Sequence, residues 1–318
     1  MRALVTGATG KVGHAVARAL LARGDEVRVL VRDPARAGGV VPDGVEMVRG
    51  DVTEPDSLRP AAEGCELVFN AMGMPEQWVR DEAVFERVNA RGTENVVRAA
   101  REAGVRRVVH TSTIDVFHAE SGERFDESEL ARYPKGTAYE RSKQHAEELA
   151  LAARGDMELV IVNPAAVYGP GPGELSIEAM VLEPVVRRRL PALVPGGFGV
   201  VYSEGLARGQ LLAAELGRDG ERYILCDRHA TLLELAQTAK RVAGRGFVPP
   251  LLPVPVIRAF ATLGELVART TGVKPLTSRG QLHFILWNAK PDSSKAQDEL
   301  GWEPTPLDEG VAAVLDGV

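Results

Sequence analysis

The sequence predicts an α/β protein, a doubly wound parallel sheet followed by a smaller and irregular C-terminal lobe. Three observations predict this fold class. Short, almost continuous Val/Ile/Leu runs alternate with stretches of helical periodicity, which is typical of strands buried on both faces. A glycine-rich loop follows the first run, at residues 7–13. After residue 165 the pattern is broken by the stretches GPGPGE, VPGGFG and VPPLLPVP.

The early apolar runs are expected to be strands that lead into helices through right-handed crossovers. We expect helices over residues 12–23, around 89–104 and over 137–150, where small and apolar residues recur at i, i+3 and i+4. The expected strands are 3–6, 27–31, 45–48, 67–70, 106–112, 158–164 and 222–226.

Composition narrows the class of protein. The chain has 318 residues, and 38 Lys+Arg against 44 Asp+Glu give a net charge of −6, which argues against a nucleic-acid-binding surface. It has only two cysteines and begins without the charged and apolar segments of a signal peptide, so we expect a cytoplasmic protein. The apolar stretch 247–270 is cut by prolines, Arg258 and Glu265. It predicts a loop plus a buried amphipathic helix, with no membrane insertion.

The loop LVTGATGKVG has the order strand, glycine loop, helix, which predicts a phosphate cradle. Gly7 allows a tight turn, Gly10 lets the backbone approach a pyrophosphate, and Gly13 lets the helix pack close to the sheet. Free N–H groups at the helix start would receive the anion. The other residues predicted to line this cradle are Thr9, Lys11 and Val12.

The end of the second strand indicates which dinucleotide is bound. An acidic residue there suits the ribose of NAD, whereas an Arg accommodates the 2′-phosphate of NADP. Arg32 follows Val31, so NADP(H) is favoured and NAD(H) is the alternative. Arg32 could instead be a surface cation that balances Asp33. After the third strand, Asp51 and Val52 are expected at the adenine, with Asp51 as a plain turn residue the competing interpretation.

The stretch TAYERSKQHAEELA places Tyr139 and Lys143 one helical turn apart. Such a pair can be a proton-transfer site or an ordinary polar helix face. A carbonyl reduced by hydride needs a proton on its oxygen, which a tyrosine can donate. The charge of Lys143, with that of an oxidised nicotinamide, is expected to lower the pKa of Tyr139. The side with Glu140, Arg141, Gln144 and Glu147 is expected to face solvent or a dimer partner.

Several motifs occur in one order along the chain: TGATGKVG, GDVTEPDSL, NARGTENVVRAAREAGVRRVVHTST, YERSK, NPAAVYGPG and DSSKAQDELGWEPTPLDEG. Together they resemble the extended short-chain dehydrogenase/reductase superfamily, which includes nucleotide-sugar epimerases and dehydratases, 3β-hydroxysteroid dehydrogenase-like enzymes and dihydroflavonol reductases. The resemblance covers nearly the whole chain. It implies a Rossmann-type NAD(P)-binding domain at residues 1–165, with a returning segment at about 200–226, and a substrate-binding lobe at 166–199 and 227–318.

The resemblance also implies a Ser/Thr-Tyr-Lys active site. Tyr139 and Lys143 match the catalytic pair, which also binds the cofactor, and Thr113 matches the hydroxyl that holds the substrate oxygen, with Ser112 as the near alternative. Asn89 matches a recurrent Asn of structural or water-ordering role. Further positions are implied to lie along the cofactor, namely Asn70, Ala71, Met72, Gly73, Pro164 and Val167.

Three features bear on the substrate. The acidic pair that follows the Thr in family dehydratases is Ile114-Asp115 here, which argues against a sugar dehydratase but leaves Asp115 as a candidate base. His118 could contact substrate or solvent. Arg188, in the run Arg187–Arg189, could clamp a nucleotide diphosphate or end a helix in solvent. The lobe also holds apolar residues that favour a hydrophobic or mixed substrate: Leu251, Leu252, Ile257, Phe260, Phe284, Ile285 and Trp287.

These features predict an NADP(H)-linked oxidoreductase that interconverts a secondary alcohol and a ketone, with Tyr139 as the proton donor or acceptor. A nucleotide-sugar epimerase with tightly bound NAD is the main alternative, and a non-catalytic NADP-sensing protein is a third. The expected partner is a small-molecule substrate, with neither nucleic acid nor a metal involved. The resemblance implies that two copies can pair through the helix after Asn89 and the Tyr139 helix.

Overall fold

A computed structural model describes residues 1–173, 176–273, 275 and 277–316. Its centre is a seven-stranded sheet in the order β10-β7-β5-β4-β1-β2-β3, with every neighbouring pair parallel. The predicted doubly wound fold is confirmed, because each expected strand is present with bounds within two residues of the prediction. The strands are β1 Arg2–Thr6, β2 Glu26–Val31, β3 Glu46–Arg49, β4 Leu67–Asn70, β5 Arg107–Thr111, β7 Glu158–Pro164 and β10 Arg222–Leu225.

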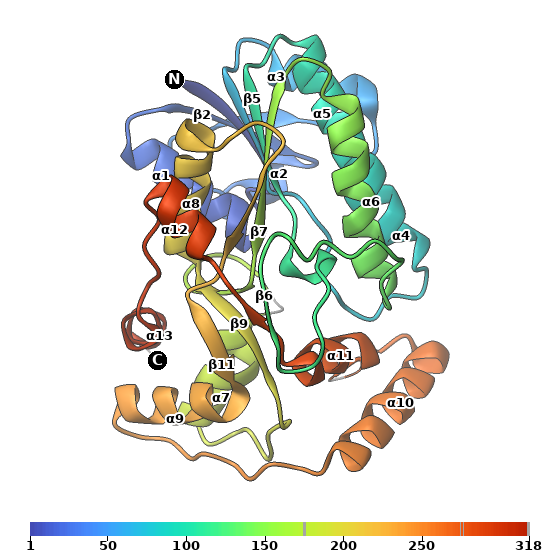
Figure 1. Cartoon of the computed structure of the whole chain (residues 1–318), viewed down its shortest axis with the longest axis vertical. Coiled ribbons are helices and arrows are strands. Elements are labelled where there is room, and N and C mark those ends of the chain that lie inside the picture. The colour runs from blue at the N-terminus through green and yellow to red at the C-terminus, as the bar shows by residue number, and fades with distance from the viewer. Residues whose placement is uncertain (174–175, 274, 276, 317–318) are drawn as a thin grey trace.

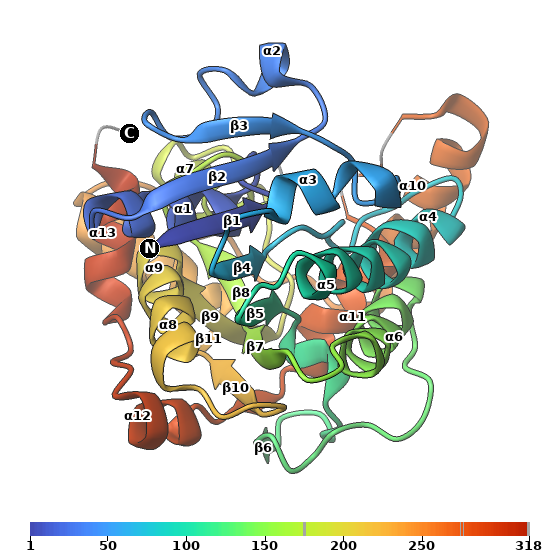
Figure 2. The ribbon, with the colours of Figure 1, turned by 90° about the horizontal axis from the view of Figure 1, so that it is seen from above.

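Helices cover both faces of this sheet (Figures 1 and 2). One face carries α1 Lys11–Ala22, α8 Ser203–Leu216 and α12 Ser294–Leu300, and the other carries α3 Arg59–Ala62, α5 Gly92–Glu102 and α6 Ala138–Ala153. Two apolar cores result, one on each face. A short helix, α2 Pro34–Ala37, follows β2 and is capped by Asp33, which accepts from the N–H groups of Ala35 and Arg36.

The strand order reverses at β1, whose neighbours are β2 and β4. In doubly wound sheets, ligands bind outside the carboxyl ends of the strands at such a point. The loop after β1 and the loop after β4 touch here. A Cβ atom on Gly7 would lie 2.7 Å from the carbonyl oxygen of Ala71. The fold therefore places the glycine loop at the expected binding crevice.

The C-terminal lobe is built on a three-stranded sheet, β11-β9-β8. The segment around α12 was predicted to belong to the lobe, but it packs on the large sheet. The indole of Trp302 is fully buried in the core between α8 and this sheet. The lobe elements are β8 Ala166–Tyr168, α7 Glu183–Val186, β9 Gly197–Tyr202, β11 Arg228–Thr231, α9 Leu232–Ala243, α10 Val254–Thr271, α11 Arg279–Trp287 and α13 Leu307–Leu315. Shorter elements are α4 Ala83–Phe85, β6 Arg124–Phe125 and β12 Lys290–Pro291.

Helix α10 corrects one expectation. The predicted helix is present, but it is not buried: it projects at the edge of the lobe, and its large apolar side chains Phe260, Leu263 and Leu266 are exposed (Figure 1). Only the opposite face, with Ile257 and Ala261, is buried. An apolar sequence pattern shows that a helix has apolar faces, but it does not show which of these faces the rest of the chain buries. No helix among the described residues has the length and hydropathy needed to cross a membrane.

Candidate active site

The glycine loop has the geometry of an anion cradle. Gly7 has a φ of 72°, which a side chain would strain, and a Cβ on Gly13 would lie 2.5 Å from the carbonyl of Gly7. Gly10 is the N-cap of α1 and provides no side-chain cap, so N–H groups of the first turn remain available to an anion. Thr9 is exposed beside it. These features fit the pyrophosphate of a dinucleotide.

Lys11 was predicted to line the phosphate cradle, but its side chain contacts the C-terminal lobe instead. Its ammonium group pairs with Glu178, in a π-helical segment of the lobe, and donates to the carbonyl of Gly169. Both charged side chains are nearly buried, with exposures of 10% and 13%. Lys11 therefore joins the glycine loop to the lobe, and these contacts do not support it as a cofactor ligand. Its neighbour Val12 packs against the core.

The side chain of Asn70 also makes its hydrogen bonds within the protein. It is fully buried, its Oδ1 accepts from Thr6 Oγ1 at 2.7 Å, and its Nδ2 lies 3.2 Å from His110 Nδ1. Its side chain holds β1, β4 and β5 together and has no free surface for a cofactor. The next two residues, Ala71 and Met72, form the loop that touches Gly7, so this segment lines the crevice through its backbone.

At the end of β2, Arg32 is exposed and makes no side-chain hydrogen bond or ion pair with any described residue. Asp33 is occupied as the cap of α2 and pairs with Arg36 at 3.4 Å, so Arg32 does not serve as its counter-ion. Asp51 accepts from both the N–H and the hydroxyl of Thr53 at 2.8 Å, which is the turn role considered for it. Val52 packs against Gly92. Arg32 thus remains available to a phosphate.

The structure brings Tyr139 and Thr113 together. Thr113 and Asp115 both lie close enough to Tyr139 to act on its pKa, and Thr113 Oγ1 donates to Asp115 Oδ2 at 2.6 Å. The ring of Tyr139 is held edge-on between Phe85 and Phe284, at centroid distances of 6.1 and 6.2 Å. Tyr139, Thr113 and Asp115 therefore form one group of hydroxyl and carboxyl side chains. Ser112 does not join it: its hydroxyl is buried without a partner among the described residues.

Lys143 is buried on the same face of α6 and donates from Nζ to the Thr111 carbonyl at 2.8 Å. Burial lowers the pKa of Lys143 to about 8, although Glu147 acts in the opposite direction. The pKa of Tyr139 was expected to be lowered, and the structure does not show this. Burial and the Asp115 carboxyl raise the pKa of Tyr139 above its ordinary value. The phenol is therefore neutral in the structure and able to donate.

Acidic groups surround the tyrosine, which the sequence did not reveal. Burial raises the pKa of Asp115 to about 6, against the hydrogen bond from Thr113. Burial, with Glu140 nearby, raises the pKa of Glu76 to about 7. His283, from α11, lies 3.7 Å from Glu140, and the hydrogen bond between them raises the pKa of His283. Only the tertiary fold assembles these residues, since no sequence spacing links residue 76 to residue 283.

The prediction that the Glu140–Glu147 side of α6 faces solvent or a dimer partner is partly wrong. Glu140 and Glu147 are almost fully buried. Glu140 forms the capping box of α6 with Thr137 and lies 3.5 Å from Lys135 Nζ. Glu147 accepts from Arg222 Nε at 2.7 Å and from Asn163 Nδ2 at 2.9 Å. Each carboxylate is buried because it has specific partners, which a polar helix pattern does not show.

Other predicted residues are placed as follows. Asn89 accepts from the N–H of Met74 at 2.7 Å and donates to Ser142 Oγ at 3.1 Å, so it fixes the loop after β4 to α6, which is a structural role. His118 bonds Tyr133 at the surface, 2.7 Å between Nδ1 and the hydroxyl. Pro164 ends β7, and Val167 lies in β8.

The arginine run at residues 187–189 ends α7 and is exposed along its length. Arg187 pairs with Glu183 one turn earlier at 3.7 Å, and Arg188 has a left-handed φ of 56°. This arrangement matches the helix-end interpretation of the run.

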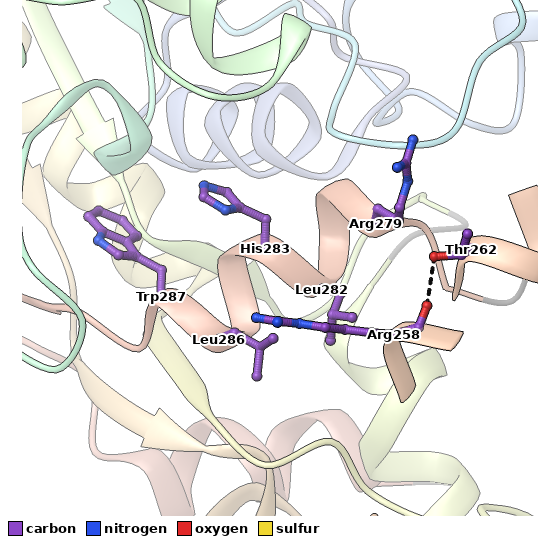
Figure 3. Close-up of a pocket in the computed structure, with 7 residues that line it drawn as sticks. All are labelled: Arg258, Thr262, Arg279, Leu282, His283, Leu286 and Trp287. Atoms are coloured by element: carbon purple, nitrogen blue, oxygen red, sulfur yellow. Dashed lines mark hydrogen bonds between the residues drawn. The ribbon is translucent and has the colours of Figure 1, made fainter. Parts of the chain in front are cut away.

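A pocket of about 420 Å³ lies between α10 and α11 (Figure 3). Arg258 extends across it toward Leu286, and His283 connects it to the cluster around Tyr139. Sequence reasoning missed its charged residues, because only the packing of two lobe helices brings them together. The pocket is lined by Arg258, Thr262, Arg279, Leu282, His283, Leu286 and Trp287.

Metal and disulfide chemistry find no support in the described part of the chain. It contains no group of three or more His, Cys, Asp or Glu side chains placed to hold a metal ion. Cys65 and Cys226 are both free and buried. What the site does offer is a phosphate cradle, a tyrosine next to a buried lysine, and a chain of proton-exchanging groups. This combination defines an enzyme class, the dinucleotide-dependent oxidoreductases and epimerases.

Comparison with known proteins identifies the family. A profile of the NAD dependent epimerase/dehydratase family matches residues 3–226, so the chain belongs to this family, within the extended short-chain dehydrogenase/reductases. The chain is 33% identical to sterol demethylase protein B of Methylococcus capsulatus, covering 96% of this chain and 94% of the relative.

Two further comparisons agree. The 4-hydroxy-2-methyl-3-oxo-4-farnesyl-3,4-dihydroquinoline-1-oxide ketoreductase of Stigmatella aurantiaca is 32% identical, over 95% of this chain and 92% of the relative. The UDP-glucose 4-epimerase of Thermus thermophilus, solved in complex with NAD, superposes with a TM-score of 0.78 at 24% identity, over 99% of this chain and 98% of that one. That likeness shows the shared fold.

Proposed function

We propose that the protein is an NADP(H)-linked oxidoreductase that interconverts a secondary alcohol and a ketone, with Tyr139 as the proton donor and acceptor. The observation that carries this proposal is the grouping of Tyr139 with Thr113 and Asp115, in which Thr113 donates to Asp115, near the buried Lys143. A bound nicotinamide cofactor would supply or accept the hydride at the substrate carbon.

In reduction, Tyr139 donates its proton to the carbonyl oxygen as negative charge develops there. Thr113 is placed to hold the same oxygen, but its proton is directed at Asp115 in the structure. Its hydroxyl must therefore turn from Asp115 to the substrate, or accept from Tyr139 and pass protons on. Because the pKa of Asp115 is about 6, this carboxyl can exchange protons near neutrality and reload the tyrosine. Lys143 keeps a positive charge beneath the site, which stabilises the phenolate after proton transfer.

Three observations support NADP(H) and a hydrophobic substrate. Arg32 is exposed and unpaired within the described residues, at the position where a 2′-phosphate would lie. The pocket between α10 and α11 is lined by Leu282, Leu286 and Trp287 together with four polar or charged residues. The names of two relatives refer to a sterol and a farnesylated quinoline, which are hydrophobic ring compounds. A nucleotide-sugar epimerase with tightly bound NAD is the alternative, because the family match applies to it equally.

The test compares Tyr139→Phe with the wild-type enzyme. Phenylalanine keeps the packing against Phe85 and Phe284 but cannot donate a proton. We expect oxidation of NADPH with hydrophobic cyclic ketones to fall about a hundredfold or more, with cofactor affinity unchanged. Tyr133→Phe, which removes a surface hydroxyl that bonds His118, serves as the control and should turn over normally.

Mass spectrometry of small molecules released from the denatured wild-type protein separates the alternatives. NAD(H) retained through purification, with no net oxidation of added NADPH, would establish the epimerase instead. Wild-type rates in Tyr139→Phe would remove the proton-donor role.

A further inference from the structure

Helix α10 has two apolar faces, and the structure covers only one. Ile257, Ala261 and Ala268 pack inward. On the other side, Phe260, Leu263 and Leu266 are 69%, 59% and 60% exposed. Spacings of three and four residues place the exposed side chains along one side of the helix. We call this set the outer face of α10, and its members are Val256, Phe260, Leu263, Leu266 and Val267.

The outer face lies in the segment of the chain where exposed apolar side chains are most frequent. Of the fourteen large hydrophobic side chains exposed among the described residues, eight fall between residues 247 and 273. Singly scattered apolar residues need no explanation, but a contiguous group marks an interaction surface. Five of these eight form the outer face, and the other three are Phe247 and Leu251, which precede α10, and Val273, which follows it.

The charge of this segment is opposite to that of the whole chain. Residues 245–279 contain five basic residues and one acidic residue, a net charge of +4, in a protein whose net charge is −6. The one acidic side chain, Glu265, is buried and pairs with Arg279, 2.8 Å between Oε2 and Nε, so it adds no exposed negative charge. Arg269 is exposed near the C-terminal end of α10, whereas Arg258, also exposed, extends across the pocket between α10 and α11.

We propose that the outer face of α10 docks on a lipid bilayer that contains anionic lipids. An exposed apolar helix face flanked by cations is the pattern of helices that lie in a membrane interface. The side chain of Arg269 is long enough to reach headgroup phosphates while the apolar side chains enter the acyl region. This departs from the sequence-based expectation of no membrane insertion: no described helix has the length and hydropathy to span a bilayer, but α10 would enter its interface.

Charge also argues against a second copy of the chain as the occupant. A symmetric dimer through this face would bring two segments of net charge +4 together, since an isologous interface pairs a patch with itself. An anionic bilayer compensates the same charge. The proposal does not depend on the proposed function, because it uses only exposed residues of α10. Its consequence for that function is that the pocket between α10 and α11 lies directly behind the membrane-facing helix.

The test is co-sedimentation of the whole protein with vesicles. We expect the wild type to pellet with vesicles of phosphatidylcholine and phosphatidylglycerol, more weakly with phosphatidylcholine alone, and less at high salt. Phe260→Ser with Leu263→Ser should weaken binding about tenfold or more. Arg269→Glu should weaken binding to the anionic vesicles only. Leu216→Ser, which removes another exposed leucine, 55% exposed and outside the segment, should bind as the wild type does.

Circular dichroism would verify that each variant is folded. The proposal is wrong if the wild type stays in the supernatant with the anionic vesicles, or if the double variant binds them as well as the wild type. Sedimentation velocity gives the competing outcome. A wild-type dimer that becomes monomeric in the double variant, together with no vesicle binding, would show that the outer face is an interface between copies.

Discussion

Replacing Asp115 by Asn tests the assignment of this carboxyl most directly. Asparagine keeps an acceptor for the Thr113 hydroxyl but has no charge and cannot titrate. Burial raises the pKa of Asp115 from an ordinary value of 3.8 to about 6 in the folded protein. The folded state therefore binds the proton more tightly than the unfolded chain does. Its contribution to stability is fully present below about pH 4 and is lost as the pH rises through about 6.

The magnitude follows from the shift. About two pKa units at 1.36 kcal/mol each set a ceiling of about 3 kcal/mol, and the partial exposure of Asp115 reduces this to about 1–2 kcal/mol. At pH 8 the variant should be more stable than the wild type by this amount, with a smaller gain at pH 5. Urea unfolding followed by tryptophan fluorescence measures both. Asp43→Asn, at an exposed site, is the control. An equal difference at the two pH values, or a loss of stability at pH 8, would refute the reasoning.

Three further predictions follow from individual residues. Arg32→Ala should weaken NADP binding about tenfold and leave NAD binding unchanged, measured by titration, because it removes a charge-assisted hydrogen bond; equal loss for both cofactors would contradict the 2′-phosphate role. Glu147→Gln removes a carboxylate that opposes the lowered pKa of Lys143, so the activity lost as the pH rises through about 8 should be lost at lower pH, read from the pH dependence of kcat. Gly7→Ala should cost at least about 2 kcal/mol in urea unfolding, because a side chain there meets a backbone carbonyl at 2.7 Å as well as a positive φ. Gly24→Ala, with a φ of 87° but open space, isolates the cost of φ alone and should be milder.

The sheet and the glycine loop were predictable because their causes are local. Continuous apolar runs, the strand–glycine–helix order and the pairing of Tyr139 with Lys143 can all be recognised from residues that are close in the sequence. The acidic surroundings of the tyrosine were not predictable, since Glu76 and His283 reach it from distant segments. The burial of Glu147 was hidden for the same reason, because its partner Arg222 lies on another strand. Amphipathicity located α10 but could not show which of its faces the fold covers.

The contact between Lys11 and Glu178 couples two parts of the molecule that are far apart in the sequence. Glu178 Oε2 is buried and has no partner in the described part of the chain, so the carboxylate depends on Lys11. An anion that draws the ammonium group toward the glycine loop would leave this carboxylate uncompensated and loosen the segment around residues 176–186. Coupling between sites is reciprocal, so a ligand that holds this segment in place must weaken the anion by the same factor. We therefore expect release of a phosphate-bearing ligand and movement of this segment to be linked, which amide hydrogen exchange along residues 176–186 would test.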